Sequence, residues 1–494
     1  MTALPHPTAR ELRGDIRHWR RGRAQARLRD VLEDAYVALF ATLMLSAILV
    51  NVIRTIGQIS DTLCTSPGCL GARALLPYLV TTAALALVLS GARLFGPVFV
   101  PPAVGSWLLS SPVDRRSLLR PRLVGTLLVA LVASALVSAT GSVLGGLDPL
   151  PLVALDATTA VLATATVALA TVDQTRRGRT TRVAAGVIAL ALWAGLLITA
   201  LGLVRVTSPT SSVPSWWWIA LAAAVAITAV AIQRAMRALA RLRQRQITPG
   251  GALVPSLSGA LAGLDLALVN DVLLAHRWRS RGSVRSRRGG STGPGALMWP
   301  ELTRMLRSPQ QILTVCAVVV APYAAATAGA GRGVIVIGGL AGFFAALPTL
   351  TGLRVLERTP GIRRNLPFTN SQIRRAALVV PTALMWLYGL AIAPAVHEAV
   401  GEPVSQTLLL GVAVGFASLT AAVRWMTGRP PDYSKPLVST PAGGVPTNLY
   451  GSVVRGMDVL LLTLAPMLLS PSDAAAWVSI LLSFAILAYL VSRD

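Results

Sequence analysis

The feature that most constrains this chain is a series of apolar blocks, most of them about 18 residues or longer. A block of that length crosses a hydrocarbon core of about 30 Å as an α-helix. Charged residues make up 13% of the 494-residue chain, whereas a soluble domain carries about 25%. The sequence therefore predicts an all-α fold, a polytopic bundle of transmembrane helices.

Twelve apolar segments qualify as candidate spans. They lie at 35–53, 74–95, 123–145, 152–172, 183–204, 215–233, 311–330, 334–353, 377–396, 405–423, 456–470 and 474–491. The first is longer than the apolar core of a signal peptide, about 7–15 residues, and is expected to be an uncleaved helix. The segment at 456–470 is short, so a broken or re-entrant element is the alternative there.

Basic residues are segregated between the two sides of this twelve-span arrangement. One side holds 41 of the 45 Lys and Arg residues, and the other holds Arg54, Arg73, Arg205 and Arg332. Because Lys and Arg collect in cytoplasmic loops, we expect both termini in the cytoplasm. Arginine so outnumbers lysine that the usage is typical of a GC-rich bacterial genome, which predicts the bacterial inner membrane. The net charge of +25 is accordingly assigned to topology and membrane lipid, with no nucleic-acid partner expected.

The predicted spans fall into two groups of six. Residues 1–233 form a first half with a basic N-terminal segment, 234–310 a basic linker, and 311–494 a second half. Within the linker, 234–246 is expected to continue the sixth helix, and 256–279 is expected to form an amphipathic helix at the membrane surface.

A short motif recurs between the second and third spans of each half. When Pro112 is aligned with Pro367, Asp114 and Thr369 both stand at a helix N-cap position. Apolar residues then pair along the motif, namely Leu118 with Ile373 and Leu123 with Leu378. Each half is thus predicted to carry a short, capped, basic helix that leads into its third span.

This motif resembles the cytoplasmic coupling segment of ABC-type export permeases of the type-two class, and the chain is similar to actinobacterial permease-like proteins of this length. The resemblance implies a permease of an ATP-driven exporter with separately encoded cytoplasmic ATPase subunits, here two copies. Typical members are six-helix subunits that dimerise, whereas this chain would supply both halves. The coupling residues implied are Pro112, Asp114, Arg115, Arg116, Pro367, Arg374 and Arg375. The alternative is that these arginines only enforce topology.

The sequence offers no catalytic, cofactor or metal site, so no enzyme activity is expected. A Walker A loop needs G-x-x-x-x-G-K-[ST], and the one lysine, Lys435, lies in Asp-Tyr-Ser-Lys-Pro. The four histidines form no H-x-x-x-H or H-E-x-x-H pair. ATP binding is therefore assigned to the partner.

Two other classes of function remain open. A secondary transporter of major-facilitator-like architecture also has twelve helices in two halves, but its coupling needs ionisable groups within the membrane. Asp156 is the clearest such group. It either lines a translocation path or hydrogen-bonds to Ser and Thr neighbours such as Thr158 and Thr159. The third class is a membrane scaffold that transports nothing.

Two cysteines, Cys64 and Cys69, lie in the first loop expected outside. The Pro67-Gly68 pair between them is typical of a turn, and an oxidising exterior permits a disulfide. Free thiols are the main alternative, and a metal site would need further ligands.

Overall fold

The structure is a computed structural model that describes most of the chain, with gaps. The described residues are single positions between 11 and 55, then 64–107, 109, 114–176, 178–204, 213–262, 266–281, 289–290, 292–428, 437–440, 443–446 and 455–493. Eleven of the 19 residues of the first expected span, 35–53, are described, and all eleven are helical. Most of the basic N-terminal segment lies outside the described residues. Side chains in part of α9, part of α10 and the hairpin are also not described.

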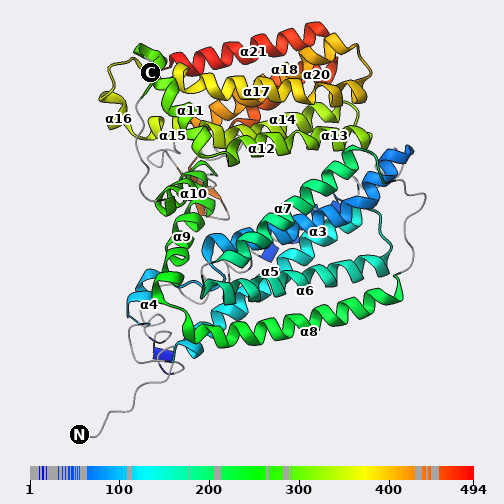
Figure 1. Cartoon of the computed structure of the whole chain (residues 1–494), viewed down its shortest axis with the longest axis vertical. Helices are drawn as coiled ribbons and strands as arrows, with labels where there is room; N and C mark the ends of the chain where they lie inside the picture. The colour runs from blue at the N-terminus through cyan, green and yellow to red at the C-terminus, as the bar shows by residue number, and fades with distance from the viewer. Residues whose placement is uncertain are drawn as a thin grey trace. The chain divides into compact units, whose positions relative to one another are not determined.

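Ten helical segments of the described chain are long and apolar enough to cross a membrane (Figure 1). They are α3 (Pro67–Phe95), α5 (Arg115–Leu144), α6 (Pro149–Gln174), α7 (Arg179–Ala200), α8 (Ser215–Ala238) with η1 (Leu239–Arg241), α12 (Gln310–Val318) with α13 (Val320–Thr327), α14 (Gly333–Ala346) with η3 (Leu347–Leu350) and α15 (Thr351–Arg358), α17 (Asn370–Val400), α18 (Val404–Met426) and α21 (Asp473–Ser492). The chain is therefore a multi-pass helical membrane protein.

Shorter elements connect these helices. They are α4 (Pro102–Trp107), α9 (Gln244–Ala262), α10 (Leu266–Arg281), η2 (Gly293–Leu297), α11 (Met298–Arg307), α16 (Pro360–Arg364), α20 (Met457–Leu469) and the two-stranded hairpin β1 (Leu437–Thr440) and β2 (Gly443–Pro446). The hairpin is the one departure from helix among the regular elements of the described residues. With 13 residues, α20 is about 20 Å long, shorter than a full span, which agrees with the alternative considered for 456–470.

The chain divides into two compact units. Unit 1 comprises Met1–Gly195, Val206–Gly259 and Ser439–Gly444, and unit 2 comprises Leu196–Arg205, Ala260–Val438 and Val445–Asp494. The main division, at 259–260, falls inside the linker predicted at 234–310. Whether the units are two equivalent six-span halves stays a prediction.

In unit 1, α6 is the central helix and packs against α3, α5 and α8. Its buried face is lined largely by Ala and Thr, so neighbouring helices approach closely. At the end of α6, Gln174 donates to the backbone oxygens of Val98 (3.1 Å) and Gln246 (2.9 Å), and it accepts from the Val98 N–H (3.3 Å). This side chain fixes both the segment after α3 and the start of α9.

The linker differs from its prediction. The helix α8 does not continue through 234–246, because η1 ends at Arg241 and the backbone of the next residue, Leu242, is extended (φ −66°, ψ 126°). A new helix, α9, begins at Gln244 and packs Ile247 and Leu253 into unit 1. The single amphipathic helix expected over 256–279 is instead divided between α9 and α10.

In unit 2, α18 is the central helix, and 78% of its most apolar stretch is buried. It packs most extensively against α17 through glycines, because the Gly389 and Gly411 backbones are in close contact. A Cβ on Gly415 would likewise collide with the Met385 carbonyl oxygen. Beside this contact, Tyr388 donates to the Gly338 oxygen (2.7 Å) and Ser418 to the Gly339 oxygen (3.0 Å), which connects α14 to both helices.

Candidate functional site

The first predicted coupling segment is the opening turn of α5. The Asp114 carboxylate caps the helix by accepting from the backbone N–H groups of Arg116 (3.1 Å) and Ser117 (3.0 Å). The N-cap predicted at Asp114 is therefore present. The helix continues without a break to Leu144, so the capped turn is the start of the spanning helix itself. Pro112 lies outside the described residues.

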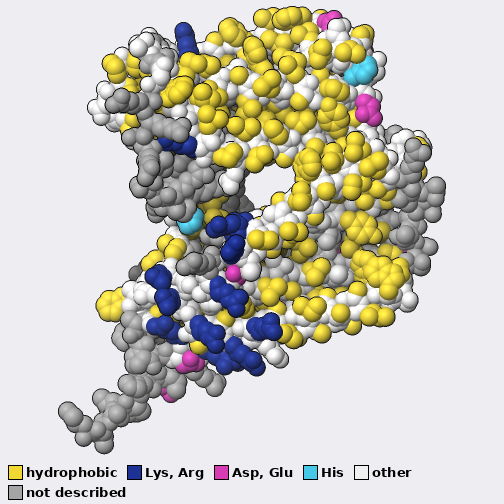
Figure 2. All heavy atoms as spheres, viewed as in Figure 1, with side chains coloured by type: hydrophobic (Ala, Val, Ile, Leu, Met, Phe, Trp, Pro, Cys, Tyr) yellow, Lys and Arg dark blue, Asp and Glu magenta, His cyan; other side chains and the backbone are white. Residues whose placement is uncertain are grey.

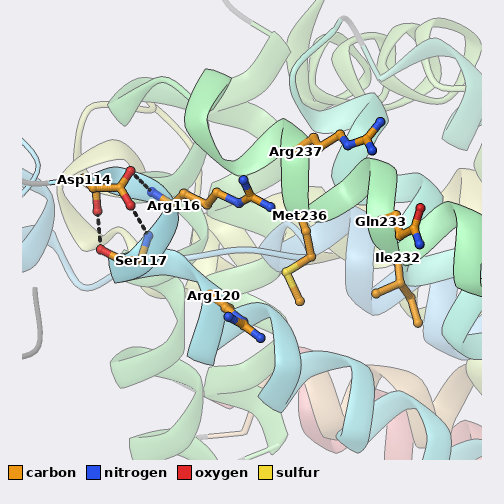
Figure 3. A pocket seen from close by; sticks show the side chains of 8 residues that line it. All are labelled: Asp114, Arg116, Ser117, Arg120, Ile232, Gln233, Met236 and Arg237. Atoms are coloured by element: carbon orange, nitrogen blue, oxygen red, sulfur yellow. Dashed lines mark hydrogen bonds between the residues drawn. The ribbon is translucent and has the colours of Figure 1, made fainter.

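The two adjacent arginines of this segment have different surroundings. Arg115 donates from Nη2 to the Leu109 carbonyl oxygen at 3.3 Å. Arg116 instead lines a pocket of about 430 Å³ between the start of α5 and the end of α8. In Figure 3 the Arg116 side chain extends from α5 toward Met236 of α8.

Three arginines surround this pocket, which we call the cationic pocket. Its lining residues are Asp114, Arg116, Ser117, Arg120, Ile232, Gln233, Met236 and Arg237. Arg116 and Arg120 lie one turn apart on the same face of α5, and Arg237 lies in the last turn of α8. Arg120 and Arg237 were not among the residues predicted from the sequence, although the i, i+4 spacing of Arg116 and Arg120 indicated a shared face.

The electrostatics of the cationic pocket favour an anion. Among the described residues, none forms an ion pair with Arg116, Arg120 or Arg237. The one carboxylate, Asp114, is already engaged with the N-terminus of α5, whose positive dipole end adds to the field. Guanidinium groups bind carboxylate and phosphate oxygens through paired hydrogen bonds. Figure 2 shows Lys and Arg side chains gathered at this end of unit 1.

The second predicted coupling segment begins α17. Thr369 and Gln372 form a capping box, in which the Gln372 N–H donates to the Thr369 hydroxyl (3.3 Å) and the Thr369 N–H to the Gln372 side chain (3.0 Å). Here too the capped turn is continuous with the long helix. Pro367 and Arg375 are exposed.

Arg374 was predicted to contact an ATPase subunit, but its side chain is buried. It is 7% exposed, and its Nε and Nη2 donate to the two carboxylate oxygens of Glu357 at 2.6 and 3.2 Å. Its Nη1 donates to carbonyl oxygens at the end of α21, those of Leu490 (3.3 Å), Val491 (3.4 Å) and Arg493. Glu357 also pairs with Arg363 at 3.5 Å. Arg374 therefore connects α15, α17 and α21 and is not available to a partner.

A second buried arginine fixes the linker to unit 2. Arg354, 1% exposed, donates from Nε and Nη2 to both oxygens of Asp271 (2.8 and 2.9 Å), and from Nη1 to the Met426 carbonyl (2.6 Å). Asp271 belongs to α10, so this contact positions α10 against α15 and α18. The helix over 256–279 was predicted to lie at the membrane surface, and this ion pair was not predicted.

Asp156 is the centre of a polar cluster inside unit 1. One of its oxygens accepts from the hydroxyls of Ser138 (2.7 Å) and Ser142 (3.1 Å) on α5. The Ser138 hydroxyl also contacts those of Thr159 (3.2 Å) and Thr81 (3.1 Å). Of the two neighbours considered in the sequence, Thr159 joins this cluster, whereas Thr158 bonds to the Ala154 oxygen and accepts from Trp217. The carboxylate thus makes interhelical hydrogen bonds and remains half-buried.

Cys64 and Cys69 form a disulfide, with their Cα atoms 5.5 Å apart. The residues between them do not form the turn that was expected. Ser66 caps α3 by accepting from the Cys69 N–H (3.2 Å), and Pro67 occupies the first helical position. The helix start therefore brings the two cysteines together. Elsewhere, no group of three or more His, Cys, Asp or Glu among the described residues is arranged to hold a metal ion.

Comparison with known family models identifies a family that matches most of the chain. The model of a family described as a family of unknown function (DUF6297) matches residues 69–436, from the first turn of α3 to just before β1. No curated protein matches the chain.

Proposed function

The chain belongs to the DUF6297 family, and we propose that it is the permease subunit of an ATP-driven exporter in the bacterial cytoplasmic membrane. In this proposal, separately encoded ATPase subunits bind nucleotide and act on the cytoplasmic end of the bundle. The helices then switch between inward-open and outward-open states. The permease contributes the translocation path and no chemistry of its own.

The observation that carries the proposal is the cationic pocket. Its guanidinium groups lie at the end of the α5 and α8 spans, where a peripheral protein can reach them, and no described acidic side chain neutralises them. An acidic side chain of an ATPase subunit fits such a pocket by charge and by volume. A contact with a partner explains these arginines better than membrane topology does, because their side chains line one cavity between two helices.

The two units are not equivalent in this respect. In unit 2 the corresponding helix start has Arg374 paired with Glu357, which leaves Arg375 as the exposed arginine of the predicted pair. We therefore propose that unit 1 makes the stronger ATPase contact. Two ATPase copies would bind through unequal surfaces.

An ion-coupled carrier is the second candidate, and the Asp156 cluster favours it. A half-buried carboxylate within a span, surrounded by hydroxyl groups, is a common feature of proton and sodium pathways. Substitution of Asp156 by Asn keeps hydrogen-bonding capacity and removes the charge. Loss of a dependence on the ion gradient in this variant supports the carrier, and unchanged ATP-dependent export supports the permease.

The decisive experiment reverses charge in the cationic pocket. The variant Arg116→Glu/Arg120→Glu is compared with Arg179→Glu/Arg182→Glu, which changes the same charge at exposed positions at the start of α7, outside the pocket. We expect the pocket variant to retain about tenfold less ATPase on co-purification, equivalent to about 1.4 kcal/mol, and the control to retain the wild-type amount. Equal retention by both variants would reject the coupling surface.

A further measurement tests the division of labour. The purified chain alone should hydrolyse no ATP, and hydrolysis should appear with the co-purified partner. Robust hydrolysis by the chain alone, retained when a contaminating ATPase is removed, would contradict the proposal.

The orientation in the membrane needs its own test. In a Cys316→Ser background, single cysteines are introduced at Ser371, at the start of α17, and at Ser470, just after α20. A membrane-impermeant thiol reagent should label Ser470→Cys on intact cells, and Ser371→Cys only after permeabilisation. The reverse pattern would place the basic end outside.

A further inference from the structure

Unit 2 has a cavity of its own, a groove along α17 and α21. Figure 1 shows these two helices side by side, α17 in yellow and α21 in red, and they are in contact. The groove has a volume of about 850 Å³ and is more apolar than the cationic pocket. Its lining includes Arg375, Thr382 and Trp386 from α17, and Phe484, Leu487 and Tyr489 from α21.

The groove has the length of one membrane leaflet. Arg375 and Trp386 are 11 positions apart on α17, which corresponds to about 16 Å along the helix. Half of a hydrocarbon core of about 30 Å is similar. Arg375 lies in the second turn of its span, so the groove runs from the basic end of unit 2 toward the middle of the membrane.

The chemistry changes along this length. Trp386, Phe484 and Tyr489 are 50%, 62% and 62% exposed, so they present aromatic surface to whatever fills the groove. The Thr382 hydroxyl already donates to the Leu378 carbonyl oxygen at 2.7 Å. The walls between the two ends therefore favour a hydrocarbon chain over a polar ligand.

Arg375 is the charged group of the groove. Its neighbour Arg374 is neutralised by Glu357, whereas Arg375 forms no ion pair among the described residues. A guanidinium at the membrane end of an apolar groove complements a molecule with an anionic head and a long apolar tail.

We propose that this groove binds an anionic phospholipid from the leaflet at the basic end, with its phosphate on Arg375 and an acyl chain along α17 and α21 toward Trp386. The lipid shields aromatic surface that unit 2 leaves uncovered. The proposal does not depend on ATPase coupling, because it concerns the chain by itself.

The test is lipid binding to the purified full chain, measured by native mass spectrometry during titration with phosphatidylglycerol or phosphatidylcholine. Wild type should bind phosphatidylglycerol more tightly. Arg375→Ala should weaken that binding about fivefold, the factor equivalent to about 1 kcal/mol for one basic residue near an anionic lipid surface. The matched control is Arg364→Ala, an exposed arginine of α16 outside the groove.

A second pair of variants tests the groove without changing charge. Ala383→Trp fills the groove from an exposed position on α17, and Leu387→Trp adds an indole to an exposed position on the same helix outside the groove. We expect the first to lose phosphatidylglycerol binding and the second to keep it, both at the wild-type melting temperature.

Three results would overturn the proposal. Equal affinity of wild type for both lipids would exclude the phosphate contact, and normal binding by Ala383→Trp would exclude the groove. A wild-type dimer that dissociates in Ala383→Trp while lipid binding is unchanged would assign the groove to a second copy of the chain. Because no ATPase is present in these measurements, failure here is distinct from failure of the permease proposal.

Discussion

The basic ends of the two units use arginine in opposite ways. In unit 2, Arg304, Arg354 and Arg374 are each paired with an acidic residue of the same unit, respectively Glu301, Asp271 and Glu357. In unit 1, Arg116, Arg120 and Arg237 line a pocket and have no such partner among the described residues. Similar positive charge therefore stabilises the fold in one unit and remains available for binding in the other.

The interiors differ as well. The centre of unit 1 contains the carboxylate of Asp156 on α6. It accepts hydrogen bonds from two hydroxyl groups on α5. At the centre of unit 2, α17 and α18 approach through Gly389, Gly411 and Gly415. The α5–α6 contact of unit 1 thus includes interhelical hydrogen bonds, whereas the α17–α18 contact of unit 2 depends on close van der Waals packing at glycines.

The largest expected loss of stability comes from removing the Glu357 carboxylate, which pairs with the buried Arg374 in unit 2. Glu357→Leu leaves Arg374 buried without its carboxylate partner, and breaking a buried pair in this way costs about 3–5 kcal/mol. Unfolding in a graded detergent–SDS mixture should show this loss. The double variant Glu357→Leu/Arg374→Leu should recover much of the stability, because no unpaired charge remains. Equal instability of the single and double variants would contradict the pairing.

A smaller loss of stability is expected from disrupting the contact between α17 and α18 in unit 2. A side chain at Gly415 meets the Met385 carbonyl oxygen, so Gly415→Leu forces α17 and α18 apart. Overpacking of this kind costs about 1–3 kcal/mol. The same unfolding assay measures it, with Gly361→Leu as control, because a Cβ on Gly361 meets no atom within 4 Å. A wild-type midpoint for Gly415→Leu would mean that these helices are not in close contact.

In unit 1, loss of the polar cluster should cost less. Ser138→Ala/Ser142→Ala removes both hydroxyl donors to Asp156. Interhelical hydrogen bonds in membranes contribute about 0.6 kcal/mol each, and about 1.7 at most. Thr140→Ala is the control, since its hydroxyl donates within α5, to the Leu136 oxygen, and has no other hydrogen bond to the described residues. If this double variant lost more stability than Glu357→Leu, the polar contacts of unit 1 would matter more for the fold than those of unit 2.

The smallest effect is expected at the cationic pocket. Arg116→Ala/Arg120→Ala removes two exposed side chains that form no ion pair with any described residue, so stability should change by less than about 0.5 kcal/mol. The same variant should nevertheless weaken ATPase association. A large loss of stability would show that the arginines serve the fold of unit 1 as they do in unit 2.

The helical spans were predictable because apolar length alone specifies them. Their ends were less so: α3 begins at Pro67 and α5 at Arg115, several residues before the apolar blocks, because capped turns with polar residues extend each helix. The N-caps at Asp114 and Thr369 were predicted from residue type and position. The break at Leu242 was not, because no proline or glycine marks it.

The candidate site was predicted only in part. Arg116 and Arg374 have the same sequence signature, an arginine in the first turns of a capped helix, but they have different roles. The difference arises from Glu357, 17 residues away, and from the end of α21, and neither contact is encoded in the local pattern. Asp156 likewise bonds to hydroxyls on the preceding helix and was compared in the sequence only with neighbours on its own.

The contact between Arg374 and the end of α21 has a consequence for biosynthesis. Leu490 follows Arg374 by 116 residues, which at a translation rate of about 5–20 residues per second is a delay of roughly 6–23 s. During that interval Glu357 is already present, whereas the carbonyl acceptors for Nη1 have not been made. Unit 2 is therefore completed only when its final helix is inserted, and a nascent chain that stalls before that point exposes a half-satisfied arginine to the quality-control machinery of the membrane.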